Sequence, residues 1–274
     1  MALDLPYAHS PIDRAAHLRS ASSQSGLALH FYEDKFACKD GALLLTQLET
    51  CVGEGEKYFL GESNAHFYLH HAPSESFTEY LGLREISTDD PYLGIAVHGQ
   101  ALAKWHENNP RCSSCGGQTH PALAGSVRRC EKCEREHYPR TDAAIIVLTQ
   151  DRSGRVLLGR QRVWEEHKFS TFAGFVEPGE SFEAAVRREV REEAGVELTD
   201  IAYVGSQPWP FPASLMVAFT ATIVDPENAR PDGSEIEEIA WFTREGIQRD
   251  IDEGRLIPPG QMSVARAMLN AWRE

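Results

Sequence analysis

Short apolar runs separated by glycine and charged residues dominate the chain, and they predict a protein rich in β-strands. In the N-terminal third, Gly, Asp and Glu clusters separate runs at residues 31–32, 42–45, 58–60 and 66–69. Runs of this length bounded by turn residues are typical of strands. Residues 92–106 differ, because Ile95, Leu102 and Trp105 fit the spacing of a helix. We therefore expect residues 1–105 to form a mixed α/β domain.

The second half of the chain predicts further strands and two helices. Residues 143–148 are an apolar run suited to a buried strand, and the Asp-Arg-Ser-Gly turn before residues 155–159 predicts a hairpin. Residues 172–176 lead into the motif that follows, and apolar segments predict three more strands, at residues 201–204, 215–224 and 236–242. A final amphipathic helix is predicted over residues 263–272.

Length and charge limit the possible partners. The chain has 274 residues, which is enough for two domains and a small module. Its net charge of −14 disfavours a broad surface for nucleic acid or acidic membrane, although a local basic pocket is compatible with it. No segment approaches the roughly 20 apolar residues of a membrane span, and the N-terminus lacks an apolar signal core. We expect a cytoplasmic protein without membrane contact.

Residues 174–196, GFVEPGESFEAAVRREVREEAGV, predict a helix with a face of carboxylates. Ser181 can cap its N-terminus, and Gly195 stands where a left-handed residue ends a helix. Glu189, Glu192 and Glu193 are spaced i, i+3, i+4 and share one face. Clustered oxygen ligands suit Mg2+ or Mn2+. The alternative is an ordinary solvated face of charged residues.

This stretch resembles the Nudix box at every fixed position. The matching residues are Gly174, Glu180, Arg188, Glu189, Glu192, Glu193 and Gly195. The resemblance implies an α+β fold, an α/β/α sandwich around a mixed sheet, over residues 140–274. It also implies hydrolysis of a nucleoside diphosphate linked to another group. The three glutamates are the predicted Mg2+ or Mn2+ ligands, with Glu192 or Glu193 also the base, while Arg188 and Glu180 brace the cluster.

A proline-rich motif, SQPWPFPAS, follows at residues 206–214. Proline fixes φ and lacks a donor, so the motif predicts a stiff extended loop rather than a sheet strand. Its aromatic rings can stack on a flat ligand, or can pack in the core of a plain connector. Behind a Nudix box, the motif resembles the signature of the NudC-like NADH pyrophosphatases, which implies cleavage of NAD(H) into NMN(H) and AMP. The implied substrate-binding residues are Gln207, Pro208, Trp209, Pro210, Phe211, Pro212, Ala213 and Ser214.

Two CxxC pairs, Cys112 with Cys115 and Cys130 with Cys133, flank residues 116–129. Four thiolates in this arrangement predict one structural, tetrahedral Zn2+. Disulfides or free thiols are the alternative, but disulfides are rare in cytosolic enzymes. The NudC-like resemblance agrees, since such enzymes often carry a four-Cys ribbon before the Nudix domain. We expect this ribbon at residues 106–139, with Cys38 and Cys51 as ordinary buried thiols.

The same resemblance implies further site residues. Ala173 would offer its carbonyl to the metal, Phe175 a platform to the nicotinamide ring, and Ala265 a contact to substrate. Tyr138 would give an aromatic contact across the interface of a homodimer. For both aromatic residues, core packing is the alternative.

An extra acid is implied just before an aromatic residue in SEIEEIAWF, where Glu238 fits best among Glu235, Glu237 and Glu238. A solvated acidic strand edge is the alternative there. Arg84 lies near the place of a substrate-contacting arginine, but the sequence itself favours a surface salt bridge.

Two rival functions remain open. The first removes NAD caps from RNA 5′ ends by the same chemistry, and needs a basic track. Such a track could come from Arg128, Arg129, Lys132, Arg135 and Arg140. The second is an inactive Nudix fold that only binds a nucleotide or a partner. It ranks last, because all the box carboxylates are present.

Overall fold

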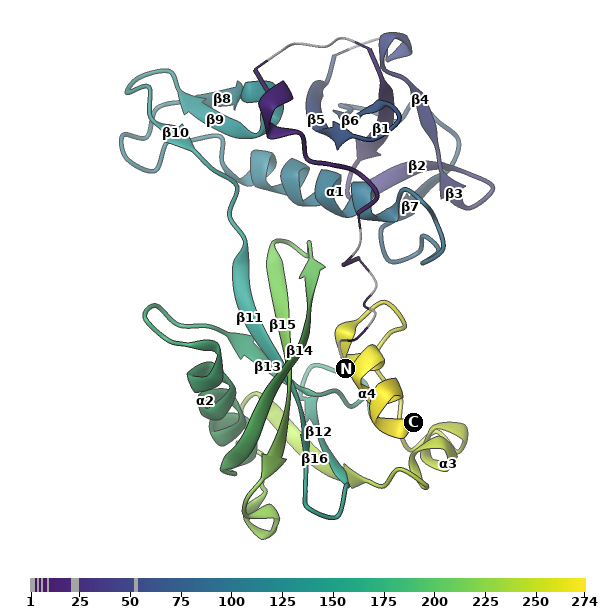
Figure 1. The fold of residues 1–274 in the computed structure, drawn as a ribbon, viewed down its shortest axis with the longest axis vertical. Helices are drawn as coiled ribbons and strands as arrows, with labels where there is room; N and C mark the ends of the chain where they lie inside the picture. The colour runs from purple at the N-terminus through teal and green to yellow at the C-terminus, as the bar shows by residue number, and fades with distance from the viewer. Residues whose placement is uncertain (1–2, 4, 6, 9, 21–24, 52–53) are drawn as a thin grey trace. The chain divides into compact units, whose positions relative to one another are not determined.

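The computed structural model describes residues 3, 5, 7–8, 10–20, 25–51 and 54–274, and these form two compact units (Figure 1). The carboxylate-helix unit, named for residues 182–194, comprises the described residues among 1–8 together with Asp142–Gln207 and Ser214–Glu274. The N-terminal unit comprises His9–Thr141 together with Pro208–Ala213. The cysteine ribbon and most of the proline-rich motif therefore group with the N-terminal region.

The N-terminal unit is built on a seven-stranded sheet and one long helix. The strand order is β3-β2-β1-β6-β5, with β4 paired to β1 and β7 to β2. The strands are β1 (Leu27–Tyr32), β2 (Lys35–Lys39), β3 (Ala42–Leu43), β4 (Leu45–Gln47), β5 (Glu56–Glu62), β6 (His66–His71) and β7 (Tyr80–Gly82). Helix α1 (Leu93–Asn108) confirms the predicted helix, and 3-10 turns lie at Ala16–Leu18 (η1) and Leu48–Thr50 (η2).

Helix α1 packs closely on this sheet. A Cβ placed on Gly99 would lie 2.9 Å from Leu69 Cδ1, so a glycine lets the helix approach β6. Most of the helix is buried rather than one face only, which explains why its sequence shows a weak amphipathic pattern.

The ribbon is a small three-stranded sheet of β8 (Thr119–Ala122), β9 (Val127–Cys130) and β10 (Glu136–His137), in the order β10-β9-β8. The 3-10 turn η3 (Leu123–Gly125) joins the first two. A buried arginine ties it to the end of α1. Arg128 donates to both Thr119 oxygens, each at 2.7 Å, and to His106 Nδ1 at 2.9 Å. His106 Nε2 in turn lies 2.7 Å from the Gly125 carbonyl. The expectation that Arg128 joins an exposed basic track is therefore wrong, because this network holds its charge inside the unit.

The carboxylate-helix unit contains a six-stranded mixed sheet. Its order is β14-β15-β11-β12-β16, with β13 paired to β11. Strands β11 and β15 run parallel, whereas β12 and β13 are antiparallel to β11. The strands are β11 (Asp142–Gln150), β12 (Val156–Gln161), β13 (Phe172–Phe175), β14 (Leu198–Trp209), β15 (Ser214–Ile223) and β16 (Ile236–Phe242).

Side chains of the sheet alternate between two helical layers. Ile145 and Val147 pack in a core with Ala185, Val186 and Val190 of α2 (Phe182–Ala194). Ile146 and Leu148 pack in the core on the opposite face of the sheet, together with α4 (Val264–Arg273). Leu5 and Ile247 of α3 (Ile247–Asp252) belong to the same core. Period-two alternation sends neighbouring strand residues to opposite faces. The predicted α/β/α sandwich is thus confirmed. None of the helices in the described residues is long and apolar enough to cross a bilayer.

The proline-rich motif corrects one prediction. Its first residues were expected to form a loop, but β14 continues through Pro208 to Trp209. Strand β14 ends the strand order of its sheet, and an outer strand tolerates proline because one side of its backbone needs no partner. The chain turns after Trp209, where the Phe211 amide donates to the Trp209 carbonyl at 2.8 Å.

Candidate active site

The carboxylate helix is fixed at both ends as its sequence predicts. The Ser181 hydroxyl accepts a hydrogen bond from the Ala184 amide at 3.2 Å. Gly195 closes the other end with φ 68°, in the left-handed region that glycine adopts without strain. The apolar face of α2, with Ala185, Val186 and Val190, packs in the core of the sheet and fixes the rotation of the helix.

Arg188 organises the acidic residues around this helix. Its guanidinium forms a two-pronged ion pair with Glu180, at 2.9 and 2.8 Å. It also donates to Glu189 at 2.8 Å, to Glu192 at 3.1 Å and to the Phe175 carbonyl at 2.9 Å. The Arg188 charge lowers the pKa of Glu180, and the Glu177 amide adds to this effect. Arg188 thus links Glu180 to Glu189 and Glu192, and the bracing of a metal site by this pair stays a prediction.

Glu189 lies directly against the strand that precedes the box. Its side chain is mostly buried, and burial raises its pKa while Arg188 acts in the opposite direction. A Cβ placed on Gly174 would lie 2.0 Å from Glu189 Cδ. Only glycine leaves room for this carboxylate beside β13.

We expect Gly174→Ala to displace Glu189 and weaken divalent-cation use. The predicted result is at least a ~10-fold rise in the Mn2+ concentration needed for half-maximal activity, in the range seen when the support of a metal site is removed. The matched control is Gly154→Ala, since no atom lies within 4 Å of that Cβ. The control glycine has φ 86°, so only its stability should fall. Unchanged Mn2+ dependence in Gly174→Ala would contradict the packing argument.

Glu193 is the most buried acid of the cluster. It is 4% exposed, and its Oε2 has no hydrogen-bond partner within the described part of the chain. Burial, together with the negative charges of Glu235 and Glu189, raises the pKa of Glu193 to about 9, although a backbone hydrogen bond at Ala173 opposes the shift. A buried carboxylate oxygen without a partner, beside two further acids, fits a divalent cation. Glu189, Glu193 and the exposed Glu192 would hold that ion, which supplies charge neutralisation and an acidified water.

The raised pKa of Glu193 predicts a pH-dependent stability. Without a divalent cation, folded Glu193 keeps its proton up to about pH 9, whereas the unfolded carboxyl loses it near its ordinary 4.5. The protonated Glu193 carboxyl group therefore contributes its full stabilisation to the fold below about pH 4.5, and this contribution is lost as the pH rises through 9. Stability should fall by at most about 1.4 kcal/mol per pH unit in this window.

Urea unfolding without added Mg2+ or Mn2+, at several pH values between about 5 and 9, measures the effect. Glu193→Gln should flatten the profile, because an uncharged side chain replaces the titrating one. Glu197→Gln, on an exposed pair with Arg191, provides the control. Equal slopes in wild type and Glu193→Gln would exclude Glu193 as the source.

The structure separates three acids that were considered together. Glu238, the predicted additional metal ligand, pairs with Arg160 at 3.1 Å, and Glu237 shares that arginine at 2.8 Å. Glu235 instead lies near enough to raise the pKa of both Glu189 and Glu193. Glu235 thus emerges as a further candidate acid, and Glu238 remains a prediction.

Strand β13 carries two other predicted residues. Ala173 pairs with Ile146 of β11 and contacts Glu193 through its backbone. Phe175 closes the strand with its ring 61% exposed, while its carbonyl holds Arg188. An exposed aromatic ring beside the acidic helix is available for stacking, so core packing is excluded for Phe175.

Segment Pro208–Ala213 brings its aromatic residues onto Arg84. The Trp209 and Phe211 rings lie 5.0 Å apart, and the Arg84 guanidinium lies 5.0 and 4.1 Å from their centres. The expectation of a surface salt bridge for Arg84 is wrong, because its partners in the structure are aromatic faces. Gln100, which no sequence pattern singled out, donates to the Pro210 carbonyl at 2.9 Å and holds the segment in place.

The ends of the motif have different environments. Gln207 is fully buried, and its amide binds the Met262 carbonyl at 2.9 Å and the Val264 amide at 2.8 Å. It therefore fixes the loop that leads into α4. Ser214 begins β15 opposite Asp142. Ala265 belongs to the core beneath α4, so its side chain faces apolar residues.

Tyr138 lies in the N-terminal unit with its side chain 66% exposed. Its phenol donates to Glu136 at 3.1 Å. The ring borders a pocket whose other lining includes Arg19, His98 and Leu102. Core packing is thus excluded for Tyr138, while its predicted contact across a dimer stays a prediction.

The four ribbon cysteines converge as a zinc site requires. Cys112 Sγ lies 3.6 Å from Cys133 Sγ, and Cys115 Sγ lies 3.5 Å from Cys130 Sγ. Sulfur atoms around a tetrahedral zinc ion, with bonds of about 2.3 Å, lie about 3.8 Å apart. The Ser114 amide lowers the pKa of Cys112 to about 5, with further hydrogen bonds from Cys115 and His137. The four sulfur atoms therefore fit one zinc ion.

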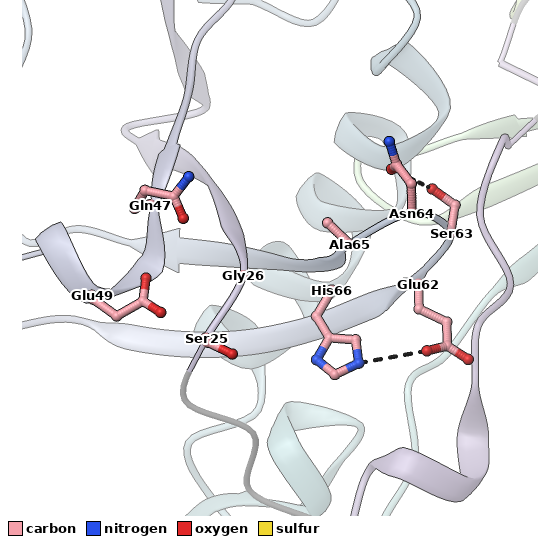
Figure 2. A pocket seen from close by; sticks show the side chains of 9 residues that line it. All are labelled: Ser25, Gly26, Gln47, Glu49, Glu62, Ser63, Asn64, Ala65 and His66. Carbon is pink, nitrogen blue, oxygen red and sulfur yellow. Dashed lines mark hydrogen bonds and ion pairs between the residues drawn. The ribbon is translucent and has the colours of Figure 1, made fainter.

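A second pocket of the N-terminal unit has a different character (Figure 2). Glu49 and Glu62 line it, and His66 contacts Glu62 at 3.5 Å. That imidazole is the single ring among the described residues that line the pocket. Its two acids also disfavour a phosphate group, so we assign it no part in nucleotide binding.

Comparison with known proteins places these features in a family context. Residues 139–258 match the NUDIX domain, and residues 107–138 match the NADH pyrophosphatase zinc ribbon domain. The chain is 42% identical over 208 residues to "NAD-capped RNA hydrolase NudC" of Mycobacterium bovis, a match covering 73% of this chain and 66% of that protein.

Two eukaryotic proteins are also similar. "Nudix hydrolase 19, chloroplastic" of Arabidopsis thaliana is 41% identical over 226 residues, covering 66% of this chain and 51% of that protein. "NAD-capped RNA hydrolase NUDT12" of Macaca fascicularis is 36% identical over 192 residues, covering 65% and 41%. The chain thus matches two thirds or less of the length of each of these relatives.

Proposed function

Since this chain belongs to the Nudix hydrolases and carries their NADH pyrophosphatase zinc ribbon, we propose that it hydrolyses the pyrophosphate bond of NAD(H). The products would be NMN(H) and AMP. The observation that carries the proposal is the buried Glu193 carboxylate beside Glu189, whose Oε2 finds no hydrogen-bond partner among the described residues, on a helix whose Arg188 brace is intact. Burying a carboxylate in this way costs folding stability, and in an inactive relative no metal-dependent activity would offset that cost.

The roles of the residues follow from charge. A pyrophosphate diester resists a nucleophile because its anionic oxygens repel it, and a Mg2+ or Mn2+ ion held by Glu189, Glu192 and Glu193 would neutralise them. Glu192 or Glu193 accepts a proton from the attacking water. Arg188 keeps Glu189 in place by its direct hydrogen bond. Phe175 offers an exposed ring for stacking on a base. In the other unit, Trp209 and Phe211 are the substrate contacts that the proline-rich motif implies.

NAD-capped RNA is the second candidate substrate. It is favoured by the names of relatives from Mycobacterium bovis and Macaca fascicularis, and it contains the same pyrophosphate bond. Arg128 cannot belong to the basic track proposed for RNA, because its guanidinium is held in the buried network. Arg129 lies 3.8 Å from the acidic Glu134, which offsets its charge. The net charge of −14 also disfavours a long RNA contact. We therefore rank the free dinucleotide first.

Product analysis tests both substrates. The purified full chain would be incubated with Mn2+ or Mg2+ and with NADH, NAD+, ADP-ribose, diadenosine tetraphosphate or NAD-capped RNA. Initial rates and product masses are measured. NMNH plus AMP formed fastest from NADH supports the proposal, and a higher specificity constant on capped RNA would move decapping first. Metal-dependent binding without turnover of any substrate would leave only a binding module.

A further inference from the structure

Three potential metal ligands meet inside the N-terminal unit, and none belongs to the carboxylate helix or the ribbon. His30 of β1 and His70 of β6 are register partners in parallel strands, so both side chains leave the same face of the sheet. Cys51 follows η2. One ligand atom from each of the three residues lies within 4.8 Å of the others.

The cluster is buried and incompletely satisfied. His30 and His70 are each 4% exposed, and Cys51 is 8% exposed. The two Nδ1 atoms lie 3.1 Å apart, and His30 Nε2 lies 2.8 Å from Thr46 Oγ1 and 3.8 Å from Cys51 Sγ. Among the residues that the structure describes, His70 Nε2 has no hydrogen-bond partner. Buried polar atoms in folded proteins are nearly always bonded, so this nitrogen requires an explanation.

From these observations we infer a second zinc site, with His30, His70 and Cys51 as its protein ligands. Imidazole nitrogen with thiolate sulfur is a donor set that suits Zn2+. The ion replaces the hydrogen bonds among the three side chains, and Cys51 releases its thiol proton to solvent when the zinc–sulfur bond forms. Thr46, already bonded to His30, is placed to hold that ring or a water in the fourth position.

The surroundings suit a structural ion rather than a reactive one. The Phe77 ring lies 4.5 Å from the His30 ring and covers it. A Cβ placed on Gly55 would lie 2.5 Å from His70 Nε2, so the backbone there closes over the second ring. The ion joins β1, β6 and the loop after η2, which are far apart in the sequence. Its function is to fix this part of the sheet.

Counting zinc by native mass spectrometry tests the inference. The full chain, purified with Zn2+ and then transferred to metal-free volatile buffer, should carry two ions. Cys51→Ala and His70→Gln should each lose one and keep the other, whereas Cys130→Ser should lose the ribbon ion only. Cys38→Ala is the matched control, because this buried thiol lies outside both clusters. It should keep both ions.

The count on the variants decides the question, because a second zinc on the wild type could also occupy the carboxylate site of Glu189, Glu192 and Glu193. Two ions on the wild type, one of them lost from Cys51→Ala and from His70→Gln, support the site. A single ion on the wild type, or a Cys51→Ala protein that still binds two, overturns it. The readout is independent of hydrolysis, so the site can fail while the proposed function stands.

Discussion

Replacing Glu193 by glutamine should lower kcat on NADH by about 10²–10⁴-fold, which is the range for removal of a general base. The amide keeps the size of the side chain but cannot accept a proton or balance a divalent charge. Its neighbour Glu192 has a contrasting environment, since it is 59% exposed and contacts Arg188. Burial should make Glu193 the stronger determinant of activity.

Measuring kcat and the Mn2+ requirement together separates the roles of the two residues. Loss of the base lowers kcat at saturating Mn2+, whereas loss of a ligand raises the Mn2+ needed for half-maximal rate. Both Glu192→Gln and Glu193→Gln are compared with Glu197→Gln, the exposed pair of Arg191, which should behave as wild type. Near-normal turnover in Glu193→Gln would refute its place in the reaction.

Replacing Cys130 by serine should remove one zinc ion and unfold the ribbon. Three strands of two to four residues bury too little apolar surface to fold alone. Structural zinc supplies about 10–16 kcal/mol of apparent binding free energy in comparable small modules. Loss of the ribbon should also free Arg128 and His106 from their shared network, and so loosen the end of α1.

Zinc content and thermal unfolding of the full chain measure this effect. We expect one equivalent less zinc and a Tm lower by several degrees, with Cys38→Ser retaining the wild-type zinc content. Hydrogen exchange should show the loss of protection concentrated in residues 107–138. A Cys130→Ser protein with full zinc content and unchanged Tm would contradict the four-cysteine assignment.

The sequence by itself determined the features that depend on local spacing. The helical period placed Glu189, Glu192 and Glu193 on one face, and the Ser181 and Gly195 ends followed from capping chemistry. The CxxC pairs likewise identified the ribbon, because each pair is a local turn that presents two sulfurs together. The sandwich itself was implied by the resemblance to the Nudix box, and the predicted strands and helices agreed with it.

Tertiary structure decided what covers each of these residues. Spacing could not show that Glu193 is buried while adjacent Glu192 is exposed, since that depends on strands elsewhere in the chain. Equally, only folding brings Arg84 to Phe211, Glu235 toward Glu193, and His30, Cys51 and His70 into one cluster. Local sequence fixes the direction of a side chain on its own element. Burial, pKa and contacts arise when distant elements pack, and no short-range pattern records them.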